Sequence, residues 1–203
     1  NEQEIMDPQM LADLYNRTGC DAFNGTPSRL KTFLELPAFQ EVVSRLKVII
    51  LGGEKYPATL LPQLREISKA RLFNTYGPTE ITVSSNVGEL TKSESVTVGP
   101  PLLNYHEYVV DNDLNELPVG VVGELLIGGL AVGKGYNDLP EKTAEAFIMY
   151  NGMKCYKSGD YARWNPDGQV VILGRKDHQI KLNGLRIELG EVETVLNRKS
   201  RKA

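Results

Sequence analysis

The feature that most constrains the fold is a short apolar run, Leu46 to Leu51, which is followed directly by Gly52-Gly53. Its sequence is LKVIIL, in which Lys47 alone is polar. A run of this length is typical of a strand buried on both faces of a parallel sheet. Helix patterns lie before and after it. Strand, helix, strand and helix in this order predict βαβ units in a doubly wound sheet.

The first 90 residues continue this alternation. Three helices are expected, each beginning at a proline because proline favours the first helical position: Pro8, Pro27 and Pro57. Gly19 is expected to end the first of these helices, and Thr26 to cap the second. Strands are expected between the helices and after the last one, at 22–24, 46–51 and 71–75.

After about Val96 the pattern changes to short alternating runs separated by turn residues. These runs predict antiparallel strands at 107–110, 124–127, 156–158 and 170–173. Asn165-Pro166-Asp167-Gly168 predicts a hairpin turn, and a helix is expected at 140–147. A polar, basic hairpin is expected from Asp177 to Arg186, and a helix from Leu189 to Leu196. The changes of pattern near residues 96 and 177 mark two candidate boundaries.

The chain of 203 residues has 23 Lys and Arg against 26 Asp and Glu, which gives a net charge of −3. A mildly acidic protein is not expected to bind nucleic acid or an anionic membrane. No apolar run reaches the roughly 18 residues that a transmembrane helix needs, and no signal peptide is expected. Cys20 and Cys155 are expected to be free thiols, which indicates a cytoplasmic protein.

The segment Asn74-Thr75-Tyr76-Gly77-Pro78-Thr79-Glu80 follows a predicted strand. In open α/β sheets, ligands bind beyond the carboxyl ends of the strands. The ring of Tyr76 can stack on a base, and the hydroxyl of Thr79 can donate to a phosphate oxygen. Glu80 can hold Mg²⁺, which binds carboxylates together with substrate phosphates. The alternative for this segment is a turn with a polar cap.

Three further segments carry candidate ligand groups. The glycines of Gly52-Gly53-Glu54 allow a ligand to approach the backbone closely, although a plain strand-to-helix turn gives the same pattern. Asp160, in Ser158-Gly159-Asp160, could accept from two ribose hydroxyls or form an Asx-turn. Arg175 could bind ribose or phosphate, or it could belong to a solvated run of charges.

Four segments in this order resemble the motifs of the adenylation domain of non-ribosomal peptide synthetases: NTYGPTE, GELLIGGLAVGKGY, YKSGD and GRKDHQIKLNGLRIELGEVE. This domain is a branch of the adenylate-forming superfamily, which includes acyl-CoA synthetases and luciferases. Pro78 and the RIELGEVE ending favour the amino-acid-activating branch. The implied α/β fold has three parts: the later part of a flavodoxin-like, doubly wound subdomain for nucleotide and amino acid (1–95), a small antiparallel β-barrel (96–176), and the hinge with the beginning of an α+β C-terminal subdomain (177–203).

The resemblance also implies roles for single residues. Six residues would bind the nucleotide, with Tyr76 stacked on adenine and Asp160 holding the ribose hydroxyls: Gly53, Glu54, Asn74, Tyr76, Asp160 and Arg175. Thr79 would contact the α-phosphate, and Glu80 the Mg²⁺. The side chain of the substrate amino acid would lie in a pocket without charged residues: Asn24, Ile50, Gly52, Thr75, Val83 and Ser84.

Two residues near the end are implied to serve a conformational change. Asp177 would be the hinge about which the C-terminal subdomain rotates between adenylation and thioester formation. Lys181 would face the reaction centre only in the thioester-forming state.

The implied reaction converts ATP and an amino acid to aminoacyl-AMP and pyrophosphate. The acyl group then passes to the phosphopantetheine thiol of a peptidyl carrier domain, and a condensation domain of the same synthetase would be a neighbour. We expect a partial domain that is inactive alone, because the phosphate loop and the Asp for the substrate amino group would precede Asn1, and the catalytic lysine would follow Ala203. The alternatives are a non-catalytic fragment that binds AMP or ATP, and an acyl- or aryl-CoA ligase.

Overall fold

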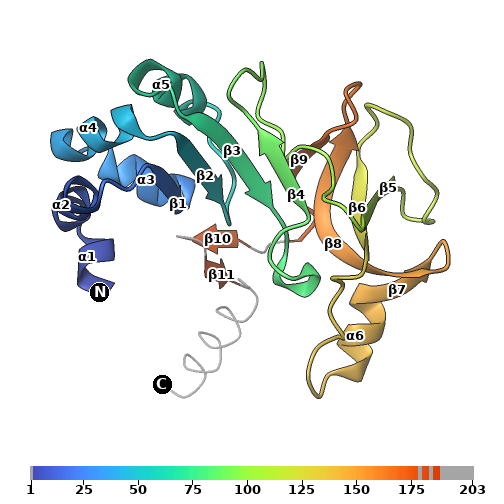
Figure 1. Ribbon diagram of the computed structural model, residues 1–203. Helices are drawn as coiled ribbons and strands as arrows, with labels where there is room; N and C mark the ends of the chain where they lie inside the picture. The colour runs from blue at the N-terminus through green and yellow to red at the C-terminus, as the bar shows by residue number, and fades with distance from the viewer. Residues whose placement is uncertain (1, 178–179, 183–184, 188–203) are drawn as a thin grey trace, which may run out of the picture.

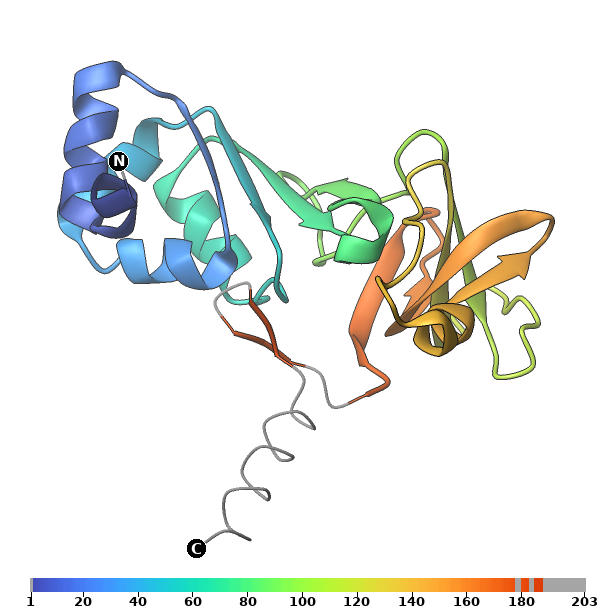
Figure 2. The ribbon, with the colours of Figure 1, turned by 90° about the horizontal axis from the view of Figure 1, so that it is seen from below.

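The computed structural model describes residues 2–177, 180–182 and 185–187. They form two main sheets that lie side by side (Figures 1 and 2). The first sheet has the order β1 (Ala22–Gly25), β2 (Val48–Gly52), β3 (Arg71–Tyr76) and β4 (Asn86–Glu89). Strands β1, β2 and β3 are parallel, and β4 runs antiparallel to β3. The three strands predicted for this part of the chain are confirmed.

Helices precede and connect these strands: α1 (Glu2–Met6), α2 (Pro8–Thr18), α3 (Pro27–Phe33), α4 (Pro37–Arg45) and α5 (Leu60–Ile67). The predicted start and end of α2 and the predicted start of α3 are confirmed. The Asp7 side chain accepts a bond from Met10 N before α2, and Gly19 ends that helix in the left-handed conformation, with φ 68°. Thr26 accepts a bond from Arg29 N and so caps α3.

Two helices and one helix start differ from the expectation. Helix α5 begins at Leu60 rather than at Pro57, because the chain first makes a turn in which Leu60 N donates to Pro57 O at 3.0 Å. Helices α1 and α4 were not predicted. The N-cap position of α4 is Leu36, which makes no capping bond through its side chain, so the usual start signal is absent from the sequence there.

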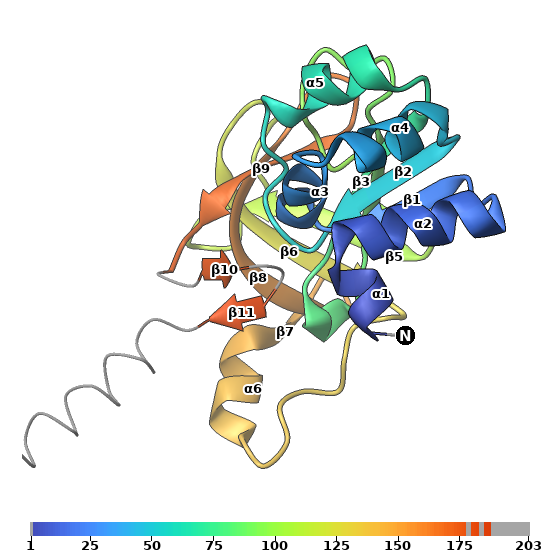
Figure 3. The same ribbon diagram turned by 90° about the vertical axis from the view of Figure 1, so that its left-hand side faces the viewer.

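Helices α2 to α5 pack on one face of the first sheet (Figure 3), whereas α1 packs against α2. Ile49 and Leu51 of β2 are completely buried in the core that they share with these helices. Val48 and Ile50 point to the opposite face and are half-buried. The sequence predicted that the apolar run is buried on both faces. Among the described residues, it is fully buried on one face only.

The second sheet contains β5 (Tyr105–Val110), β6 (Gly123–Gly129), β7 (Phe147–Tyr150), β8 (Met153–Trp164) and β9 (Val170–Arg175). Its order is β5-β6-β8-β7, and β9 also pairs with β8. All its pairs are antiparallel, and register shifts in the β6·β8 and β8·β9 pairs accompany the curl of this sheet. The predicted antiparallel half is thus confirmed, with β7 as an additional strand.

Local turn chemistry explains the β8–β9 connection. The Asn165 carboxamide oxygen accepts bonds from Asp167 N at 3.1 Å and Gln169 N at 2.8 Å, so the predicted hairpin turn is confirmed. Trp164, the only tryptophan of the chain, is the last residue of β8. It packs against the core of the second sheet, which also contains Ile81 from the segment after β3.

The remaining elements are short. Helix α6 (Pro140–Ala146) confirms the helix expected at 140–147, and β7 follows it directly. Strands β10 (Ile180–Leu182) and β11 (Leu185–Ile187) pair antiparallel within the segment predicted as a hairpin. The helix predicted at 189–196 lies outside the described residues. Within the part of the chain that the structure describes, no helix is long and apolar enough to span a membrane.

The two sheets are joined directly by the segment that follows β4. Val98 N donates to Val170 O, and Val170 N donates to Gly99 O, both at 3.1 Å. From β3, the Asn74 carboxamide donates to Thr97 O at 2.9 Å. The carboxyl ends of the parallel strands therefore face the second sheet across a fixed junction.

Candidate functional site

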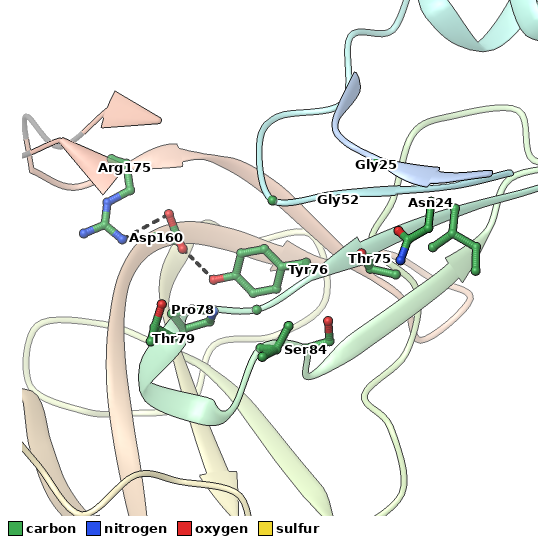
Figure 4. Close-up of a pocket in the computed structure, with 14 residues that line it drawn as sticks. Asn24, Gly25, Gly52, Thr75, Tyr76, Pro78, Thr79, Ser84, Asp160 and Arg175 are labelled. Atoms are coloured by element: carbon green, nitrogen blue, oxygen red, sulfur yellow. Dashed lines mark hydrogen bonds and ion pairs between the residues drawn. The ribbon is translucent and has the colours of Figure 1, made fainter. Parts of the chain in front are cut away.

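A cavity of about 510 Å³ opens at the carboxyl ends of β1, β2 and β3 (Figure 4). All six residues predicted for the amino-acid pocket line it. Five predicted nucleotide and phosphate residues line it as well: Gly53, Tyr76, Thr79, Asp160 and Arg175. The cavity therefore brings together eleven predicted residues that are widely separated in the sequence, from Asn24 to Arg175.

A second cavity, of about 420 Å³, adjoins the first and shares Tyr76 and Asp160 with it. It contains the two remaining residues predicted to border adenine, Glu54 and Asn74. Apolar and aromatic residues that no motif singled out complete its wall, among them Tyr56, Val96, Val98 and Ile172. Val96 and Ile172 lie in the half of the sequence expected to form the barrel, so no local pattern connected them with the nucleotide segment.

Tyr76 joins the two sheets at the wall between the cavities. Its ring belongs to the end of β3, and its hydroxyl donates to Asp160 Oδ2 of β8 at 2.5 Å, as Figure 4 shows. Burial and the Asp160 carboxylate raise the pKa of Tyr76 well above its ordinary value. The phenol therefore stays protonated and remains a donor to the carboxylate.

Arg175 stands opposite Asp160 in the β8·β9 pair. Its Nη1 donates to Ser158 O at 2.6 Å and lies 3.5 Å from Asp160 Oδ1. The other side of the guanidinium binds the Asp177 carboxylate through two bonds, of 2.9 and 2.5 Å. A Cβ on Gly159, whose φ is +68°, would lie 2.8 Å from Arg175 Nη2, so glycine makes room for this arginine.

Thr79 and Glu80 lie in a 3-10 turn, η1 (Thr79–Ile81). Thr79 lines the larger cavity, whereas the side chain of Glu80 is buried beside it and accepts a bond from the Tyr136 hydroxyl at 2.8 Å. Among the described residues, no group of three or more His, Cys, Asp or Glu could hold a metal. A single carboxylate fits Mg²⁺ when phosphates and waters supply the other ligands. Glu80 offers one carboxylate next to Thr79 in the chain, although it lines neither cavity itself.

The predicted amino-acid pocket is neutral and carries three hydrogen-bonding side chains, those of Asn24, Thr75 and Ser84. A Cβ on Gly52 would come within 1.9 Å of the Thr75 hydroxyl, so glycine leaves the space that this side chain uses. Val83 is 74% exposed and lies at the open side of the cavity.

Two residues predicted to border adenine, Glu54 and Asn74, also form hydrogen bonds within the fold. Glu54 Oε1 accepts a bond from Ser28 N at 2.6 Å, in the first turn of α3. Asn74 is buried and forms the bond to Thr97 described above. The backbone of Lys181 lies in β10, and its side chain is outside the described residues.

A ligand cavity at the carboxyl ends of parallel strands, completed by an aromatic ring, a carboxylate and a guanidinium, defines a nucleotide-binding type of α/β protein. The sequence model of the family described as AMP-binding enzyme matches residues 1–137. The chain belongs to this family.

Among curated relatives, tyrocidine synthase 3 of Brevibacillus parabrevis is 41% identical over 95% of this chain. Gramicidin S synthase 2 of Aneurinibacillus migulanus is 37% identical over 96% of it. The chain spans 3% and 4% of the lengths of these two relatives.

Solved structures show the same arrangement. PA1221, described as an NRPS protein containing adenylation and PCP domains, superposes with a TM-score of 0.84 at 26% identity; the match covers 95% of this chain and 35% of that one. NpsA-ThdA, an artificially fused adenylation-PCP di-domain NRPS from Klebsiella oxytoca, gives 0.83 at 28% identity, over 94% and 36% of the two chains. The α/β fold with a curled antiparallel sheet is therefore that of NRPS adenylation domains.

Proposed function

We propose that this chain forms part of an adenylation domain that activates an amino acid with ATP for non-ribosomal peptide synthesis. The observation that carries the proposal is the pair of adjoining cavities with Tyr76 and Asp160 in their common wall. One cavity suits a nucleoside and the other an amino acid, so the two reactants would meet beside Thr79. The relatives and structures similar to this chain support the same activity.

In this proposal the nucleoside occupies the smaller cavity. Adenine stacks on the ring of Tyr76 and is bordered by Gly53, Glu54 and Asn74. Asp160 accepts bonds from the ribose hydroxyls, and Arg175, whose guanidinium lies 3.5 Å from Asp160 Oδ1, assists in holding the ribose. Holding both reactants in one orientation is a main source of rate in a transfer of this kind.

Thr79 donates to the α-phosphate, and Glu80 is the protein ligand of Mg²⁺. When bound, Mg²⁺ neutralises phosphate charge during attack by the substrate carboxylate. Asp177 is the hinge about which the C-terminal subdomain rotates after adenylation. Lys181 faces the reaction centre only after this rotation, in the thioester-forming state. The boundaries proposed for the three subdomains remain 1–95, 96–176 and 177–203.

The neutral pocket accommodates the side chain of an uncharged amino acid, because it offers no charged partner: Asn24, Ile50, Gly52, Thr75, Val83 and Ser84. The acyl group then passes to the phosphopantetheine thiol of a carrier domain, with a condensation domain as a neighbour. Cys20 and Cys155 are both free, in keeping with the cytoplasmic location that we propose.

The first test replaces Asp160 by Asn in the full-length protein that contains these residues. AMP affinity, measured by calorimetry, is expected to fall about tenfold or more, because hydrogen bonds to a charged group contribute roughly 1.5–3 kcal/mol. Asp167→Asn, in the exposed hairpin turn, is the matched control and should leave the affinity unchanged. Equal affinities for both variants would contradict the ribose assignment.

The second test measures ATP–pyrophosphate exchange with a panel of amino acids, fatty acids and aryl acids. Exchange that depends on an uncharged amino acid is expected, and Glu80→Ala should lower it by orders of magnitude. Exchange with fatty or aryl acids alone would instead indicate an acyl- or aryl-CoA ligase. AMP binding without any exchange would indicate a non-catalytic binding protein.

A further inference from the structure

The carboxyl group of Glu80 contacts Tyr136, the last residue of the GELLIGGLAVGKGY segment, to which the sequence assigned no individual role. The Tyr136 hydroxyl donates to Glu80 Oε1 at 2.8 Å. Glu80 is only 8% exposed, so this bond forms where little water competes for the carboxylate oxygen. A hydrogen bond to a carboxyl oxygen in such surroundings is strong and directional. The tyrosine therefore fixes the direction in which the carboxylate points.

The backbone of the turn that carries Glu80 is held by the second sheet and its loops. Gly133 N donates to Glu80 O at 2.7 Å, from the same segment as Tyr136. The Tyr105 hydroxyl of β5 donates to Ile81 O at 3.0 Å. A Cβ on Gly133 would lie 2.9 Å from Glu80 O, so the segment passes as close to the turn as glycine allows. Side chain and backbone of Glu80 are thus positioned together.

Tyr136 is itself firmly placed. Its ring packs edge to face against Phe147, with ring centres 5.6 Å apart and planes at 71°. Its N–H donates to the Thr143 hydroxyl at 2.9 Å. Lys154 Nζ donates at 2.8 Å to two carbonyls of the segment, one of them that of Gly133. The hydroxyl is therefore held in position independently of any ligand.

We propose that Tyr136 is a positioning residue for Glu80, whose hydroxyl orients the carboxylate toward a divalent cation. This inference rests on the proposed function, in which Glu80 is the protein ligand of Mg²⁺. A carboxylate has two oxygens, and a bond to one of them fixes the rotation of the group while the other can contribute to a cation. Hydrogen-bond partners of metal ligands typically account for 10- to 100-fold in metal affinity or activity.

A purely structural role for Tyr136 would need only its ring. Tyr136→Phe keeps the ring contact with Phe147 and removes only the hydroxyl, so it separates the two roles. Tyr150→Phe is the matched control. The Tyr150 hydroxyl lies 3.4 Å from Oε1 of the exposed Glu116, and Tyr150 lines neither cavity.

The experiment uses the full-length protein and Mn²⁺ as a paramagnetic probe for the Mg²⁺ position. Mn²⁺ is titrated into protein saturated with a non-hydrolysable ATP analogue, and binding is followed by water-proton relaxation. Tyr136→Phe should weaken Mn²⁺ binding about tenfold or more. AMP affinity without metal and the midpoint of thermal unfolding should stay close to those of the wild type. Tyr150→Phe should change none of these values.

A double variant tests whether Tyr136 acts through Glu80. If it does, Tyr136→Phe combined with Glu80→Gln should bind Mn²⁺ no more weakly than Glu80→Gln alone, because the two residues form one unit. Additive losses would overturn the positioning role. Tighter Mn²⁺ binding by Tyr136→Phe would also overturn it, since the hydroxyl would then compete with the cation.

The inference and the proposed function fail in different ways. If Glu80→Gln weakens Mn²⁺ binding and Tyr136→Phe does not, the positioning role is wrong and the metal role of Glu80 stands. If neither variant changes Mn²⁺ binding, the metal role of Glu80 is wrong, and the role of Tyr136 is wrong with it.

Discussion

The carboxyl group of Glu107 lies inside the protein, where β5 approaches the start of β4. It is 8% exposed, and its Oε2 accepts a bond from the Asn86 carboxamide at 2.9 Å. Burial raises the pKa of Glu107 from 4.5 to about 7, although the bonds from Asn86 and Ser85 oppose this effect. The folded chain therefore keeps a proton that the unfolded chain releases at lower pH.

This carboxyl predicts how the free energy of unfolding depends on pH. Between about pH 5 and 7 the unfolded chain binds fewer protons at this position, so stability falls as pH rises. The difference between a pKa of 4.5 in the unfolded chain and of about 7 in the folded chain corresponds to roughly 3 kcal/mol of unfolding free energy lost above pH 7. Glu107→Gln has no carboxyl group to ionise, so it should regain this free energy above pH 7. Urea unfolding of the wild type and of Glu107→Gln at pH 5 and pH 8 measures this difference in unfolding free energy. An equal pH slope for both would contradict the assignment.

Single residues also show where prediction from the sequence ends. The position of Tyr76 at the carboxyl end of a strand was predictable, because the NTYGPTE segment overlaps the end of the strand expected at 71–75. The bonds from Tyr76 to Asp160 and from Tyr136 to Glu80 were not, since each joins residues distant in sequence. Local patterns do not encode which parts of two sheets come into contact.

At the scale of elements, the features that depend on neighbouring residues were predicted best. Helix α2 has an N-cap bond and a left-handed C-cap glycine, and both involve residues within four positions. Helix α4 was missed because its N-cap residue, Leu36, has no side-chain acceptor. Strand β7 was missed because it follows α6 directly and pairs only with β8, so its existence depends on that partner.

The cap of α2 gives a prediction at this scale. Asp7→Ala should lower the free energy of unfolding by about 1 kcal/mol, because Met10 N loses its acceptor. Asp13→Ala, on an exposed position inside the same helix, is the control and should cost less than half as much. Chemical denaturation followed by far-ultraviolet circular dichroism measures both. Equal losses would show that the cap contributes nothing specific.

For the whole molecule, the candidate site exists only because two sheets with different patterns meet. The pocket residues on β1, β2 and β3 were predictable as a group, because the carboxyl ends of parallel strands share one edge. The contribution of Ile172 and Val96 to the second cavity was not predictable, because it depends on the junction at residues 97–99.

The junction predicts that both sheets unfold together. Backbone bonds between Val98, Gly99 and Val170 and the buried Asn74 link the two cores, so separation of the sheets would break several buried hydrogen bonds at once. Unfolding monitored in either half should therefore give one transition midpoint. Two separated midpoints would show that the junction is weaker than its bonds indicate.

The location of Trp164 makes this measurement possible without any label. Because the chain has one tryptophan, and it lies at the end of β8, its fluorescence emission reports on the second sheet alone. Helices α2 to α5 all pack on the first sheet, so the ellipticity at 222 nm reports mainly on the half of the chain that contains the first sheet. These 203 residues thus carry two spectroscopic reporters, one on each side of the two cavities, and a ligand that contacts both sheets should shift both signals in parallel.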